Sequence, residues 1–206
     1  MKVYSRFITR IHPQLGKNEL RLCLILLDLC NKEENTIDVD DLHNHPVFVN
    51  TIKHQFNSLC NNIVGKKILC GKYTTEATPI YTIFESIQKT KHNIIIKLTK
   101  SALHQFQLGW NVSVNPNQIS ALNKLTEIKF FLWVKTWIGN KERRVDIDVL
   151  KTYMGVTSKN KCFLMNYIKP LTRSLWGLNI YIDYTKIYKK NSKKNIHGLH
   201  FKEMGK

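Results

Sequence analysis

The 206-residue chain contains two ordered copies of one pattern, and this repeat predicts a fold built from two similar units. A shift of 108 residues carries Glu19 onto Glu127, Arg21 onto Lys129 and the run 37–40 onto 145–148. Further along, a shift of 116 residues carries the pair 52–53 onto 168–169. Because the matches fall in order at element boundaries, each copy is predicted to form a long helix, a short strand, two helices and a hairpin.

The second copy carries the clearer periodicity. Residues 149–155 share an apolar helical face and end at Gly155, which is a helix stop. From about 159 to 176 an apolar residue recurs every fourth position, which predicts a longer helix with one buried stripe: Phe163, Tyr167, Leu171 and Leu175. Pro170 is predicted to kink this helix into two pieces, because proline lacks an N–H group. Alternation at 180–184 and 196–201 predicts two strands of a hairpin.

Two helices followed by a basic hairpin form the plan of a winged helix. The predicted fold class is therefore α+β, with two tandem winged-helix domains that each have a helical core and a β-hairpin wing. The segment Gly109–Pro116 is rich in turn residues and is predicted to join the domains, which would span 1–110 and 111–206. One long helix is expected after this junction, from Asn117 to Gly139. Asp38, Asp40, Asp146 and Asp148 recur in both copies, which favours a structural role at the strand-to-helix turn.

The net charge of +17 is concentrated near the C-terminus. The last 66 residues contain fifteen lysines and arginines against five acidic residues. Such a field attracts a polyanion, and nucleic acid is the expected one. Residues 28–41 instead contain six acidic residues and only Lys32, so part of the first copy is expected to face protein.

The longer helix and the hairpin carry the candidate DNA-binding residues. Asparagine can pair with adenine and lysine can reach guanine, so residues at the helix start are expected to meet base edges or phosphate: Ser158, Lys159, Asn160 and Lys161. The rest of the outward face adds Asn166, Lys169 and Arg173, of which the two cations are expected to contact phosphate. The hairpin adds a basic wing at 186–194, made of Lys186, Lys189, Lys190, Lys193 and Lys194.

These segments resemble the last winged helix of the iteron-type plasmid replication initiators. The resemblance rests on residues 150–155, on 163–164 with 167–171, on the strand 180–184 and on the stretch 193–201. Lys193 and Lys194 stand where the family usually has an arginine-containing pair, and Arg173-Ser174-Leu175 stands where it often has Glu-Ile-Asn. The resemblance implies tandem winged helices, with a first domain that serves dimerisation and DNA-backbone contact and a second that is the main DNA reader. It also implies binding to repeated origin sites of a plasmid or phage.

Two other functions remain open at this point. One is a transcription regulator of the same fold, and the other, ranked lower, is a DNA-nicking relaxase suggested by His43-Asn44-His45. No P-loop motif, metal-ligand spacing or paired carboxylates stand out, so we expect a protein that is not an enzyme and has no cofactor and no metal.

Double-stranded DNA is the expected partner, with a homodimer and host helicase or initiator proteins as further candidates. No membrane association is expected, since no apolar run approaches the ~18 residues of a span. The expected location is the bacterial cytoplasm, in association with the nucleoid.

Overall fold

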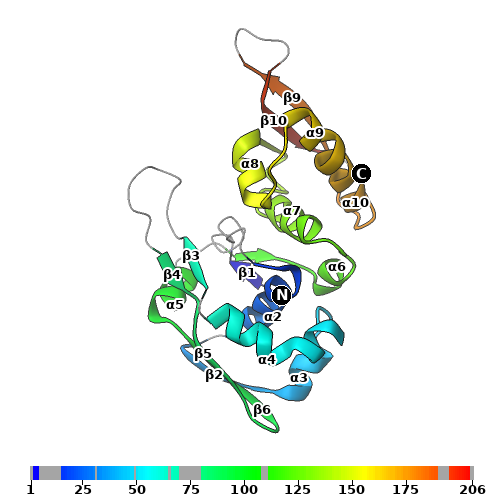
Figure 1. The fold of residues 1–206 in the computed structure, drawn as a ribbon. Coiled ribbons are helices and arrows are strands. Elements are labelled where there is room, and N and C mark those ends of the chain that lie inside the picture. Colours follow the sequence, from blue (N-terminus) through cyan, green and yellow to red (C-terminus); the bar gives the residue numbers. More distant parts are fainter. Residues whose placement is uncertain are drawn as a thin grey trace. The chain divides into compact units, whose positions relative to one another are not determined.

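The computed structural model describes residues 2–4, 15–30, 32–48, 50–64, 66–69, 80–107, 111–189 and 195–204. The chain divides into two compact units, Met1–Leu122 and Asn123–Lys206, called unit 1 and unit 2 below (Figure 1). Each unit is mixed helix and sheet and is a winged helix. The α+β tandem winged-helix fold expected from the sequence is therefore confirmed.

The division between the units falls later than the sequence placed it. Strand β7 (Asn111–Ser113) pairs antiparallel with β1 (Lys2–Tyr4), and helix α6 (Pro116–Ser120) follows. The buried Arg21 donates to the carbonyl oxygen of Leu122 at 2.6 Å. These contacts hold residues 111–122 in unit 1, whereas the predicted domains met between residues 110 and 111.

The single long helix expected from Asn117 to Gly139 is wrong. Helix α6 ends at Ser120, and α7 (Leu125–Lys135) begins after a short break. The backbone N–H groups of Asn123 and Lys124 both donate to Glu127 Oε2, at 2.9 Å each. A carboxylate that satisfies free N–H groups in this way starts a new helix.

Unit 2 contains all the helices and strands of a winged helix, in the expected order along the chain. After α7 come β8 (Glu142–Asp146), α8 (Ile147–Met154), a helical run at 160–176, β9 (Ile182–Tyr188) and β10 (Ile196–Glu203). The antiparallel sheet has the order β8-β10-β9, with the central strand formed last in the chain. Figure 1 shows β9 and β10 as a long hairpin beside the helical run.

Unit 1 has the same order of elements. It runs through α2 (Lys17–Leu29), β2 (Glu34–Asp38), α3 (Val39–Asn44), α4 (Asn50–Val64), β5 (Phe84–Lys89) and β6 (Asn93–Leu98), and its sheet order is β2-β6-β5. The 108-residue shift places β2 on β8 with both ends matched. A two-stranded sheet of β3 (Lys67–Leu69) and β4 (Ile80–Thr82) and the helix α5 (Lys100–Gln107) have no counterpart in the described part of unit 2. The repeat read from the sequence is thus confirmed.

The two copies share the same hydrogen bond at the strand-to-helix turn. Asp38 Oδ1 accepts from the N–H of Asp40 at 2.7 Å, and Asp146 Oδ1 accepts from the N–H of Asp148 at 2.8 Å. Each aspartate therefore caps the helix that follows its strand, as expected from the sequence.

An aromatic cluster forms much of the core of unit 2. The rings of Phe130, Trp133, Trp137 and Tyr184 all lie around Phe201 of β10, with centroid distances between 5.2 and 6.2 Å. Helix α7 is buried on nearly every side, from Ile128 to Val134. This cluster fixes the sheet against α7 and so sets the position of the hairpin.

The run at 160–176 remains one helix in spite of Pro170. It consists of α9 (Asn160–Phe163), a π-helical turn (Leu164–Ile168) and α10 (Lys169–Trp176), with helical backbone angles at both joins. The N–H of Lys169 donates to the carbonyl of Leu164, five residues back. This wider turn accommodates the proline without a break, so the predicted division into two pieces does not occur. Of the predicted inward stripe, Phe163, Leu171 and Leu175 are buried and Tyr167 is half-buried.

Within the described residues, no helix is both long and apolar enough to cross a bilayer.

Candidate nucleic-acid interface

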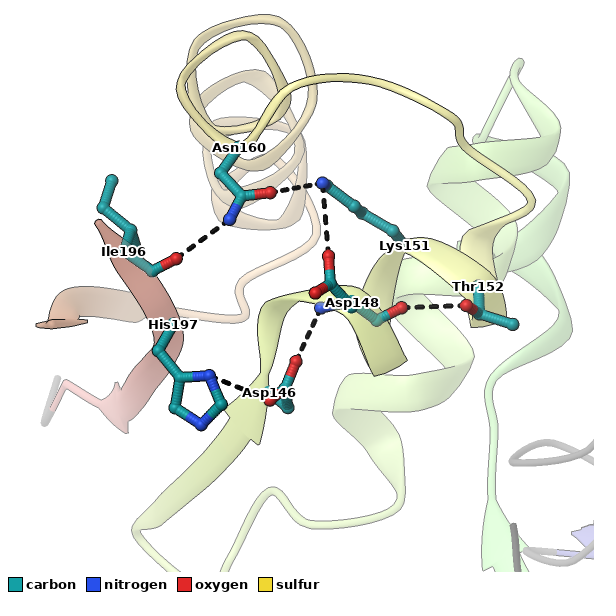
Figure 2. A network of polar contacts seen from close by, with 7 residues as sticks. All are labelled: Asp146, Asp148, Lys151, Thr152, Asn160, Ile196 and His197. Atoms are coloured by element: carbon teal, nitrogen blue, oxygen red, sulfur yellow. Dashed lines mark hydrogen bonds and ion pairs between the residues drawn. The ribbon is translucent and has the colours of Figure 1, made fainter. Parts of the chain in front are cut away.

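The start of the helical run is tied to the hairpin through Asn160 (Figure 2). Its side-chain Nδ2 donates to the carbonyl oxygen of Ile196 on β10 at 2.9 Å. Its Oδ1 accepts a short hydrogen bond from Lys151 Nζ, and that ammonium also lies 3.4 Å from Asp148 Oδ1. The amide that the sequence suggested as a base reader therefore connects α8, α9 and β10.

A second contact joins α8 to the hairpin. Besides capping α8, Asp146 places its Oδ2 3.2 Å from Nδ1 of His197, which follows Ile196 on β10 (Figure 2). On the same two strands, His200 Nε2 lies 2.9 Å from Glu142 Oε2. The base of the hairpin is consequently held to the strand and helix that precede the helical run.

These contacts surround a polar cavity of about 510 Å³. It is lined by the acidic pair Asp146 and Asp148 and by the cations Lys161 and Lys189, together with Asn160 and residues 195–197. Both lysines are exposed and come from different elements, the helix start and the end of β9. Two exposed cations on one surface can both contact phosphates of the DNA backbone.

The predicted residues at the helix start differ in exposure. Lys159, Lys161 and Asn166 are exposed to solvent. Ser158 is half-buried, and its Oγ atom is buried without a hydrogen-bond partner among the described residues. Its hydroxyl is therefore turned away from any ligand on the outer surface.

Three of the predicted cations lie on a second surface. Lys169 and Arg173 of α10 and Lys186 of β9 line a groove of about 600 Å³ between the helix and the strand. Lys186 lies on β9, which continues to Tyr188 and pairs Lys186 with Leu199 of β10. Of the other wing lysines, Lys189 directly follows the strand, whereas Lys190, Lys193 and Lys194 lie outside the described residues.

Several residues that line or support these two surfaces were absent from the sequence prediction. Lys151, His197 and Trp176 reach their partners through contacts between elements, which local periodicity does not report. Asp146 did carry a signal, since it recurs in both copies, but only its capping role could be inferred from that recurrence. Trp176 follows Arg173 by three residues, a spacing that places both on one side of a helix.

The histidines that suggested a nicking enzyme have structural contacts. His45 is buried, accepts the N–H of Val47 through Nδ1 at 3.2 Å and has its Nε2 3.5 Å from Asp28. The ring of His43 packs against Phe48 with centroids 5.1 Å apart. Within the described ranges no group of three or more His, Cys, Asp or Glu side chains is arranged to hold a metal ion.

The fold and these surfaces define the class: a tandem winged-helix protein with a basic second unit. Among solved structures, the chain is similar to the Pi initiator protein, crystallised in complex with iteron DNA, with a TM-score of 0.70 and 13% identity. That match covers 98% of this chain and 96% of the other. Domains 2 and 3 of RctB match with a TM-score of 0.50 and 9% identity, over 91% of this chain and 82% of that one.

No protein-family model matches the chain, and no curated protein matches it significantly in sequence. The resemblance to iteron-type replication initiators is confirmed at the level of the fold.

Proposed function

We propose that this protein binds double-stranded DNA at specific, repeated origin sites and acts as a replication initiator of a plasmid or phage. The observation that carries the proposal is the joint placement of Lys161 and Lys189 beside the start of the helical run, on a fold that matches the Pi initiator protein over almost its full length. The helix start would enter the major groove, and the wing would follow the flanking phosphates.

In this proposal the residues have separate roles. Lys159, Lys161 and Asn166 are exposed along the helix and would meet bases and phosphates. Lys189 and the wing lysines beyond it would neutralise phosphate, while Lys169, Arg173 and Lys186 add to the attractive field around unit 2. Asn160 would act mainly by holding the helix start against β10.

The acidic surface of unit 1 supports a different role for that unit. Glu34, Asp38, Asp40 and Asp41 are exposed on β2 and α3, where they would repel phosphate. We therefore assign homodimer formation to unit 1, along with a share of DNA-backbone contact by its less acidic parts. Host helicase or initiator proteins are further partners of the proposed role, which is non-enzymatic and is carried out at the nucleoid in the cytoplasm.

Selection of binding sites from random duplex DNA tests the proposal. We expect one defined motif, bound far more tightly than random duplex, and repeated copies of that motif beside the gene. The double variant Lys159→Ala/Lys161→Ala should weaken binding by about tenfold or more, whereas Lys202→Ala, an exposed residue near the opposite end of β10, should not. Uniform binding without any motif would exclude a sequence-specific initiator.

Experiments with the selected DNA site also distinguish the two alternative functions, a transcription regulator and a nicking enzyme. A single site in place of an array would favour a transcription regulator. Metal-dependent cleavage of one labelled strand, lost in His43→Ala and His45→Ala, would show a nicking enzyme.

A further inference from the structure

The groove between α10 and β9 combines two kinds of side chain that duplex DNA binding does not require together. Its cations are Lys169, Arg173 and Lys186, and its large apolar groups include Met165, Trp176 and Tyr188. The apolar side comes from the π-helical turn, the end of α10 and the end of β9. Wide π-helical turns within helices frequently occur at functional sites.

The apolar groups of this groove are unusually exposed. Met165 is 58% exposed, and Trp176 and Tyr188 are 44% exposed. The Trp176 ring is nevertheless fixed, because its Nε1 donates to the carbonyl oxygen of Ile182 at 3.2 Å. A fixed, half-exposed indole beside a methionine and a tyrosine is typical of a surface that another molecule covers.

The strand that borders the groove has an open edge. In the sheet order β8-β10-β9, strand β9 is the last strand, and no described strand pairs with its outer edge, where Trp176 Nε1 donates to the carbonyl oxygen of Ile182. On either side of β9, the carbonyl oxygen of Tyr181 accepts from the N–H of Met204, and the N–H of Lys189 donates to the carbonyl oxygen of Asn195. The backbone N–H and C=O groups of the odd-numbered residues of β9 therefore point toward β10. Because backbone groups alternate in direction along a strand, those of Tyr184 and Lys186 face the groove side. The N–H of Tyr184 accordingly donates to the side chain of Asp183 at 2.7 Å and not to the ladder.

The charge of the groove favours an acidic partner. Three cations line it against one carboxylate, Asp183, and that carboxylate already accepts the N–H of Tyr184. A groove between an open edge strand and a helix is the geometry in which extended peptides add as a further strand. Backbone pairing then supplies affinity, and alternate side chains enter the groove.

We propose that this groove docks an extended acidic segment of a partner protein, which pairs with the outer edge of β9. Apolar residues of the segment lie against Trp176 and Met165, and its carboxylates meet Lys169, Arg173 and Lys186. The lining of the groove and that of the cavity beside Lys161 and Lys189 share no residue. The inference goes beyond the proposed DNA binding and does not depend on it.

The probe is a short labelled peptide in which every second residue is in turn glutamate, leucine, glutamate and phenylalanine, with serine between them, so that acidic and apolar side chains fall on the same face of the strand. Binding to the full chain is followed by fluorescence anisotropy. Lys186→Glu and Met165→Glu should each reduce peptide affinity by about tenfold or more. Lys161→Glu is the matched control, expected to weaken duplex binding and leave peptide binding unchanged. Replacing the central residues of the peptide by proline should abolish binding, since proline cannot donate to a strand.

Amide hydrogen exchange reports the mode of binding directly. On addition of the peptide, the N–H of Lys186 should gain protection, because it becomes a ladder donor. Peptide affinity that Lys186→Glu leaves unchanged would overturn the proposal. Two other results would also overturn the proposal, because each would assign the groove to nucleic acid. One is the loss of peptide binding when duplex DNA saturates the protein. The other is binding of oligo(dT) in preference to the peptide, if Met165→Glu and Lys186→Glu remove it.

Discussion

At the scale of single residues, the same position of the repeat carries a buried cation in both units. Arg21 of unit 1 donates to carbonyl oxygens at the end of α6, with the shortest contact to Leu122 at 2.6 Å. Its counterpart Lys129 is fully buried, and its Nζ has no hydrogen-bond partner among the described residues. Burial lowers the pKa of Lys129 to about 8. Arginine can distribute its charge over several carbonyls, whereas this lysine has no such acceptor within the described residues.

Replacing Lys129 by methionine should therefore stabilise unit 2. The folded pKa lies below the unfolded one, so between about pH 8 and 10.5 the unfolded chain binds more protons, and the free energy of unfolding rises with pH. At neutral pH the charged amine opposes folding, and Lys129→Met should be more stable by about 1–4 kcal/mol. Denaturant unfolding followed by tryptophan fluorescence measures this, since three of the four tryptophans lie in unit 2.

The control is Lys135→Met, at a half-buried position near the end of the same helix. The stability difference between wild type and Lys129→Met should shrink as the pH rises above about 8. A difference that stays constant up to about pH 10 would contradict a depressed pKa for Lys129.

The hydrogen bond between Asn160 and Lys151 predicts that both residues affect DNA recognition in the same way. Asn160→Ala is expected to reduce discrimination between DNA sites. If Asn160 acts by positioning the helix start, Lys151→Met should reduce discrimination to a similar extent, because Lys151 holds the Asn160 amide. The Lys151 side chain is only 12% exposed, so it has little surface with which to contact DNA itself. The double variant should lose little more than either single variant, with a coupling of about 0.5–3 kcal/mol. Site-specific and random duplex are titrated in parallel, and full discrimination in Lys151→Met would indicate direct base reading by Asn160.

At the scale of secondary-structure elements, the closeness of β8 and β10 depends on Gly198. This residue is buried beside the irregular register at the start of β10. A Cβ atom at Gly198 would lie 2.8 Å from the carbonyl oxygen of Val145, which is backbone and cannot rotate away. The glycine therefore allows the hairpin to pack against β8, and with it the Asp146–His197 contact.

Gly198→Ala is expected to push these strands apart and to destabilise unit 2 by about 1–3 kcal/mol. Gly177→Ala is the matched control, since its backbone φ is −61° and the nearest atom to a new Cβ is 3.4 Å away. Unfolding curves for both variants would test this. Equal stability of the two variants would mean that the strands yield without cost.

At the scale of the whole molecule, the asymmetric charge predicts how binding responds to salt. If about six phosphates are neutralised, log K should fall with log salt at a slope near −5. Lys193→Ala with Lys194→Ala should flatten the slope by about two for all DNA sequences alike, because phosphate contacts carry no sequence information. Titrations of the selected site and of random duplex over a range of salt concentrations measure this. A slope near zero would remove the electrostatic basis of the proposed function.

Much of the fold followed from local features of the sequence. The repeat predicted two equivalent units, alternation located the hairpin strands, and the two aspartates of each copy marked the strand-to-helix turns. These features depend on periodicity and capping between near neighbours, which the sequence displays directly. The break between Ser120 and Leu125 was missed because the apolar spacing continues across it. The cap that starts the second helix consists of hydrogen bonds from the backbone N–H groups of Asn123 and Lys124 to Glu127, which the apolar spacing does not show.

The winged-helix plan, most of the buried stripe of the helical run and the concentration of charge in unit 2 thus follow from the amino-acid sequence. Which side chains meet depends on how the elements pack. It placed the Asn160 amide between Lys151 and Ile196, turned the Ser158 hydroxyl inward and divided the predicted cations between a cavity and a groove. The physical reason is that a helical or strand period fixes only the face on which a residue lies, whereas its partner depends on the packing of elements far apart in the chain.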